Sequence, residues 1–110
     1  MGYDKKGNFV LNSVLEQGTL TSHITRRTID GKKVPTVTLE STSDKTNSCL
    51  KITVILTEKQ VIEMKQKNFG KGSVARVVGL LRTTNSGKVV IVADYIGGVG
   101  FLINKKFASE

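Results

Sequence analysis

The sequence predicts an all-β fold, a five-stranded barrel with one short helix between its third and fourth strands. Two β-branched segments, residues 71–83 and 89–96, flank a turn of Thr, Asn, Ser and Gly and predict a β-hairpin. Gly79 inside the first segment predicts a sharp bend, as at the corner of a small closed barrel. Strict alternation over residues 50–56 predicts a strand with one face in the core.

The strands before the helix are predicted from the same alternation. Residues 50–56 place four apolar side chains on one face, those of Leu50, Ile52, Val54 and Leu56. Val37 and Leu39 turn toward the core by this rule, and Thr38 turns outward. Both segments are therefore expected to contribute one wall of the core.

A helix is expected over residues 57–68. Thr57 and Gln60 have the spacing of a capping box, in which each side chain serves a free backbone N–H of the first turn. Glu63 and Lys67 are spaced for an i,i+4 ion pair. Three apolar side chains would cover the end of the barrel: Val61, Met64 and Phe69.

The strand around Gly79 is expected to carry apolar residues on both of its faces. An inward set is expected at Ala75, Val77, Gly79 and Leu81. The outward apolar set is then Val74, Val78 and Leu80. A soluble monomer rarely leaves such a patch exposed, so these three residues predict an interface in a homo-oligomer, a dimer or a tetramer. The alternative cover is the C-terminal segment of residues 101–107.

Four motifs occur in order between residues 12 and 96. They are Gly18-Thr19-Leu20-Thr21 after Asn12-Ser13-Val14, the turn Thr28-Ile29-Asp30-Gly31 with Val37-Thr38-Leu39 after it, and the two arms of the hairpin described above. Together they resemble the OB-fold single-stranded DNA-binding proteins of bacteria, phages and plasmids, a family that includes primosomal replication protein N. The strand and helix order is that of an OB fold.

This resemblance implies an OB-fold domain over residues 12–96, with an N-terminal arm at 1–11 and a C-terminal arm at 97–110. It implies binding of single-stranded DNA without sequence preference, in DNA replication, recombination or transfer. The chain resembles a short form of the family without the acidic C-terminal tail, as in mobile elements, and we expect no recruitment of partner enzymes through such a tail.

Composition is consistent with a nucleic-acid partner. Lys and Arg number 17 against 9 acidic residues, a net charge of +8, which favours a polyanion. The lysines are spread along the chain, and no apolar run approaches the roughly 18 residues that a membrane span needs. We therefore expect no membrane association. The single Cys49 fits a reducing compartment, and a cytoplasmic location is expected.

The cations fall where an OB fold binds its ligand, on one sheet face and on the loops joining strands 1–2 and 4–5. Eight of them are expected to follow a phosphate backbone: Arg26, Arg27, Lys32, Lys33, Lys51, Arg76, Arg82 and Lys88. The chain has no Trp, so Tyr95 is the candidate for base stacking, with a core or interface position as the alternative.

No catalytic constellation is found in the sequence. His23 is the only histidine and has no acidic neighbour, and Cys49 alone cannot build a zinc site. We expect a protein that is not an enzyme and that needs no metal or other cofactor. The alternative function is an OB-type protein-interaction module, an assembly factor or inhibitor whose cations only solubilise it. RNA is the alternative nucleic-acid ligand.

Overall fold

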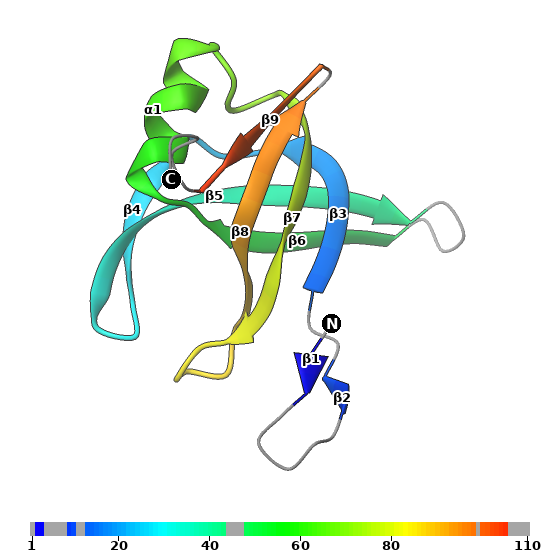
Figure 1. Cartoon of the computed structure of the whole chain (residues 1–110), viewed down its shortest axis with the longest axis vertical. Helices are drawn as coiled ribbons and strands as arrows, with labels where there is room; N and C mark the ends of the chain where they lie inside the picture. The colour runs from blue at the N-terminus through cyan, green and yellow to red at the C-terminus, as the bar shows by residue number, and fades with distance from the viewer. Residues whose placement is uncertain (1, 4–8, 11–12, 44–47, 99, 106–110) are drawn as a thin grey trace.

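The computed structural model describes residues 2–3, 9–10, 13–43, 48–98 and 100–105. The elements in chain order are β1 (Gly2–Tyr3), β2 (Phe9–Val10), β3 (Ser13–Leu20), β4 (Thr25–Ile29), β5 (Lys32–Ser43), β6 (Ser48–Ile55), α1 (Glu58–Gln66), β7 (Val74–Thr83), β8 (Val89–Gly98) and β9 (Phe101–Asn104). Figure 1 shows α1 at one end of the barrel and the β7–β8 loop at the other.

Five strands close into a barrel in the order β3-β7-β8-β6-β5. β3 completes the circle by pairing with β5, where Thr19 lies opposite Glu40 and Leu20 opposite Leu39. β6 and β8 run parallel, and the other barrel pairs are antiparallel. The connection between β6 and β7 contains α1. This order confirms the predicted OB fold, with its helix between the third and fourth barrel strands.

Two further strands extend the barrel sheet. β4 forms a hairpin with β5, from Thr25 opposite Thr36 to Ile29 opposite Lys32. β9 pairs with the end of β8, and its Ile103 is buried in the core. The described part of the expected C-terminal arm is thus a strand on its own barrel, and it does not lie over the outward residues of β7.

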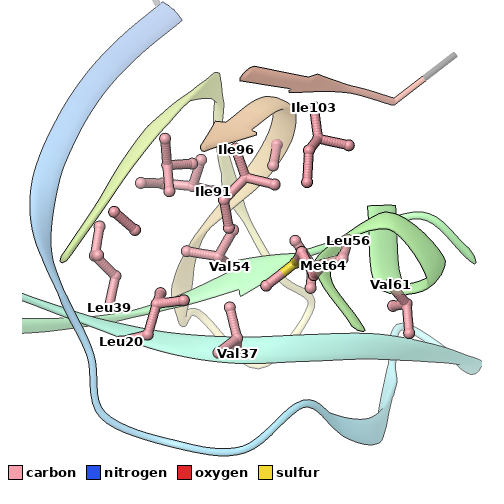
Figure 2. Packing of buried hydrophobic residues seen from close by; sticks show 13 residues of the cluster. Leu20, Val37, Leu39, Val54, Leu56, Val61, Met64, Ile91, Ile96 and Ile103 are labelled. Carbon is pink, nitrogen blue, oxygen red and sulfur yellow. The ribbon is translucent and has the colours of Figure 1, made fainter. Parts of the chain in front are cut away.

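The core fills the barrel between its strands and α1 (Figure 2). As predicted, Val37, Leu39 and Val54 are buried in it, and Val61 and Met64 of α1 cover the barrel end. Leu50 is expected to face inward, but it is 54% exposed because it pairs with Ser41, beyond the point where β5 contacts β3 to close the barrel.

The sequence predicts a bend at Gly79, and the structure shows an irregularity in the strand pairing and a close approach of two strands there. A Cβ added there would lie 2.1 Å from the backbone oxygen of Val92, so a larger residue requires the strands to separate. The register also changes at this point: Gly79 pairs with Ala93, Val78 pairs with Tyr95, and Asp94 is left as a bulge residue. After Gly79 the expected alternation of inward and outward side chains is not observed. Leu81 is expected to point inward, but it is 40% exposed.

The capping box of α1 is confirmed. The Thr57 hydroxyl accepts from the backbone N–H of Gln60, and the Gln60 side chain accepts from the backbone N–H of Thr57. The expected Glu63–Lys67 pair is wrong. Glu63 instead lies 3.3 Å from the Lys59 ammonium, while the Lys67 ammonium lies 5.0 Å above the ring of Phe101.

Candidate nucleic-acid interface

The carboxylate of Asp30 links the β4–β5 hairpin to the β7–β8 loop through hydrogen bonds. Asp30 and Gly31 form the hairpin turn with φ values of 50° and 81°, a conformation that an Asp-Gly pair adopts readily. The turn presents the Asp30 carboxylate to the neighbouring loop, where it accepts hydrogen bonds from the Asn85 backbone N–H at 2.8 Å and from the Arg82 guanidinium at 2.9 Å. These contacts fix the relative position of the two loops.

The same contacts lower the pKa of Asp30. The main cause is the hydrogen bond from the Asn85 backbone. Desolvation opposes it as the next largest effect, and Arg82 lowers the pKa further through a hydrogen bond and its positive charge. The carboxylate is therefore ionised throughout the neutral range and keeps Arg82 in place.

The β7–β8 loop is held by its own hydrogen bonds. Thr84 is buried, its backbone N–H donates to the Lys88 oxygen at 2.8 Å, and its hydroxyl accepts from the Lys88 backbone N–H at 3.2 Å. Gly87 has a φ of 88° and donates to the Thr84 oxygen at 2.9 Å. The loop therefore presents Lys88 from a defined backbone.

Between the two loops lies a cleft of about 390 Å³. Its lining includes Arg27 and Thr28 of β4 and Asn85, Ser86 and Lys88 of the β7–β8 loop. A smaller depression of about 150 Å³ borders on Asp30 as well. The depression has apolar side chains from four strands and two cations: Ile29, Val34, Ile55 and Val92, with Lys32 and Arg82. We call these two hollows together the loop cleft. It combines an apolar floor with four cations.

The structure brings four of the predicted cations together at the loop cleft: Arg27, Lys32, Arg82 and Lys88. Lys33 is exposed on β5, and the Lys51 ammonium lies 4.0 Å from Glu40. Arg26 is engaged elsewhere, since both of its terminal nitrogens donate to the Glu58 carboxylate at the start of α1. This contact lowers the pKa of Glu58.

Arg76 and Tyr95 lie on a different surface, the outer face of β3, β7, β8 and β9. Residues directly opposite one another on paired strands share a face. Tyr95 lies opposite Val78, which in turn lies opposite Leu15 of β3. Arg76 occupies the next row, opposite Gln17. Neither residue lines the loop cleft.

This outer face is largely apolar. Val74 is 59% exposed and Leu80 40%, as the strand parity predicted, and Val78 is half-buried. Two leucines that the sequence analysis did not single out extend the patch, Leu15 at 67% and Leu102 at 59% exposure. We call these five residues the apolar outer face. A groove of about 630 Å³ runs along it, bordered by Arg76 and Phe101.

Comparisons with known proteins rest on structure alone. No family model matches the chain, and no curated protein matches its sequence. A single-stranded DNA-binding protein of Mycobacterium smegmatis superposes with a TM-score of 0.61 at 20% identity, over 80% of this chain and 88% of that one. The dimeric N-terminal domain of PriB from Thermoanaerobacter tencongensis gives 0.57 at 22% identity, over 82% and 98%.

The mitochondrial single-stranded DNA-binding protein of S. cerevisiae gives a TM-score of 0.65 at 12% identity, over 90% of this chain and 100% of that one. The chain shares the OB fold of these proteins. In an OB fold the ligand lies on the face of the second and third barrel strands, between the 1–2 and 4–5 loops. The corresponding elements here are β5, β6, the β4–β5 hairpin and the β7–β8 loop, which form the loop cleft.

The described part of the chain contains no group of three or more His, Cys, Asp and Glu side chains placed to hold a metal ion. None of the described helices is long and apolar enough to cross a membrane. His23 is exposed in the connection between β3 and β4. The side chain of Cys49 lies outside what the structure describes.

Proposed function

We propose that the protein binds single-stranded DNA without sequence preference, in DNA replication, recombination or transfer, and that the loop cleft is its primary contact. The observation that carries this proposal is the meeting of four cations around an apolar floor on the ligand face of an OB fold. Cations neutralise phosphates and release counterions, while the aliphatic floor offers a non-polar surface that does not distinguish one base from another. The OB-fold proteins that superpose on this chain include two named for binding single-stranded DNA.

The remaining predicted residues belong to a path beyond the cleft in this proposal. Lys33 and Lys51 would contact phosphates along β5 and β6, and Arg26 would do so by exchanging Glu58 for a phosphate. Arg76 and Tyr95 lie on the outer face, so strand contacts there require the DNA to leave the cleft and pass around β8.

The test is a fluorescence titration of labelled oligo-dT at several salt concentrations. Four to six neutralised phosphates give a log–log slope of about −3 to −4 for a single strand. A salt-independent affinity, or no binding at low salt, contradicts the proposal. Competition by oligo-U of the same length measures the preference for DNA over RNA.

We also propose that a second copy of the chain covers the apolar outer face, in a dimer or tetramer. Leu15, Val74 and Leu102 are each more than half exposed there, and soluble monomers rarely keep so much contiguous apolar surface. One of the superposing proteins, the PriB domain, is dimeric. If instead the chain is a protein-interaction module without DNA binding, this same face is the surface that a different partner would cover. Oligo-dT binding separates the two functions.

The proposed activity is binding rather than catalysis. The loop cleft contains cations, hydroxyls, amides and one carboxylate that is already engaged by Asn85 and Arg82. Each Asp30 oxygen already accepts a hydrogen bond and the pKa of this carboxyl is lowered, which makes it a weak general base.

A further inference from the structure

A second hollow lies at the end of the barrel that carries α1. It has a volume of about 420 Å³, within the range of pockets that hold small ligands. Three segments build it: His23 and Ile24 between β3 and β4, the end of α1 with the residues after it, and the loop at Gly70 and Lys71. We call it the helix-end pocket.

The pocket has an apolar floor and a cationic rim. Ile24 and Phe69 are partly buried against the core, and Met64 beneath them is fully buried. Lys65, Lys71 and His23 are exposed around it. Of the described residues that line the pocket, none is acidic. This combination suits a ligand with a flat apolar part and a negative group, which is the chemistry of a nucleotide.

Hydrogen bonds fix the wall that carries Lys71. Gly70 donates its backbone N–H to the Ser73 hydroxyl at 3.1 Å, and the Ser73 N–H returns to the Gly70 oxygen at 2.9 Å. Gly72 donates to the Leu20 oxygen of β3 at 2.7 Å. The Phe69 N–H bonds the Met64 oxygen at 2.9 Å. The pocket is therefore formed before any ligand enters.

The C-terminal end of α1 contributes a partial negative charge to this region, and this charge is reduced because the carbonyls of Glu63, Met64 and Lys65 accept backbone hydrogen bonds. A helix terminus is equivalent to about half an elementary charge. Lys65 and Lys71 together carry two full positive charges beside it. The pocket therefore favours an anion over a cation.

β4 connects the two hollows. His23 and Ile24 directly precede it, and Arg27 and Thr28 near its other end line the loop cleft. Arg26 and Arg27 are exposed between these points. A strand of this length, 5 residues, spans roughly 17 Å. Arg27 is one cation on this path, and Arg26 becomes a second when a phosphate displaces its Glu58 partner.

We propose that the helix-end pocket is a second subsite for single-stranded DNA, which takes one nucleotide unit of a strand that leaves the loop cleft along β4. Its phosphate would bind Lys65 and Lys71, and its base would lie against Ile24, Phe69 and the imidazole of His23. This inference rests on the proposed DNA-binding function and adds the path of the strand.

The test compares the full-length Lys65→Ala/Lys71→Ala double variant with wild type on oligo-dT of two lengths, about 4 and about 16 nucleotides, the limits for one OB fold. The longer strand should reach the pocket, so its affinity should fall about tenfold and its log–log salt slope should become shallower by about 1.4. The shorter strand should fill only the loop cleft and keep its affinity.

Lys67→Ala is the matched control, since Lys67 lies on the same helix end but contacts Phe101 and does not line the pocket. It should change the affinity of the longer strand by less than about twofold. Backbone amide NMR signals of His23 and Lys71 should shift with the longer strand only. If wild type binds the longer strand but the double variant behaves as Lys67→Ala does, the subsite is wrong and the primary cleft stands. If wild type binds neither strand, the proposed function itself fails.

Discussion

Asp30 accepts a hydrogen bond from Arg82 at 2.9 Å, although the two residues are 52 positions apart in the sequence. The contact joins the tips of two hairpins and makes their separation a fixed property of the fold. A ligand that enters between them meets walls already in place, so little ordering free energy has to be spent on loop closure.

The loss of stability at acidic pH should depend on the Asp30 carboxylate. The pKa of Asp30 is lowered in the folded state, so its contribution to stability is complete above the unfolded value of about 3.9 and is lost as the pH falls through the folded value. Glu58 behaves in the same way through Arg26. We expect the thermal midpoint to fall as the pH is lowered from about 5 to about 2. Asp30→Asn should flatten this dependence, and an identical slope in that variant would count against the Asp30 contacts.

Removal of the cleft cations should weaken DNA binding without unfolding the protein. The triple variant Arg27→Ala/Lys32→Ala/Lys88→Ala leaves Arg82 with Asp30 and removes three charges. Its oligo-dT salt slope should become shallower by about 2.1. The thermal midpoint should stay nearly constant, because exposed substitutions change stability by about 0.5 kcal/mol or less.

The comparison variant for this experiment removes three charges from the other predicted contacts, Lys33→Ala/Lys51→Ala/Arg76→Ala. We expect it to lose less affinity than the cleft triple. Equal losses would mean that the loop cleft is not the primary contact.

Gly79→Val should destabilise the barrel. The new side chain would meet the Val92 backbone oxygen, which a rotamer change cannot avoid, and such overpacking costs roughly 1–3 kcal/mol or more. The midpoint of denaturant unfolding measures it. Gly70→Ala is the control, because a Cβ there has no atom within 4 Å, and its midpoint should match wild type.

The oligomer should depend on the apolar outer face. Light scattering at micromolar concentration should give a multiple of the 12.0 kDa chain mass. Val78→Glu buries a charge in that contact and should return the mass to that of one chain. Lys33→Glu, on the exposed side of β5, should leave the assembly intact. A wild-type mass of one chain would refute the interface, and an intact Val78→Glu oligomer would place it elsewhere.

The sequence was sufficient to predict those structural features that depend on residues close together in the chain. The Thr57–Gln60 capping box and the inward-facing side chains of Val37 and Val54 are set by neighbours within a few residues. The bulge at Asp94 is not readable in this way, and it follows from the register between two whole strands. This register places Tyr95 opposite Val78, on the apolar outer face.

The contacts of Arg26 and Asp30 could not be predicted either, because they join residues that are distant in the sequence. Arg26 was expected to be free for DNA, yet Glu58 reaches it because β4 passes the start of α1. The partner of Asp30 depends on which two hairpin tips meet. Charge counts and strand parity identify candidates for such contacts, while the three-dimensional path of the chain decides which candidates are used.

The burial of Ile103 in the core has a consequence for how the chain folds during synthesis. β3 needs β7 and β5 as neighbours, and β8 needs β6, β7 and β9. The β3–β7 and β6–β8 pairings are distant in sequence, so their loop-closure entropy is lost before the contacts that repay it can form. The nascent chain therefore cannot complete its core until Ile103 has left the ribosome. Up to that moment the β-branched strands β7 and β8 are exposed together, and early release of the chain should lead to aggregation rather than to a smaller stable domain.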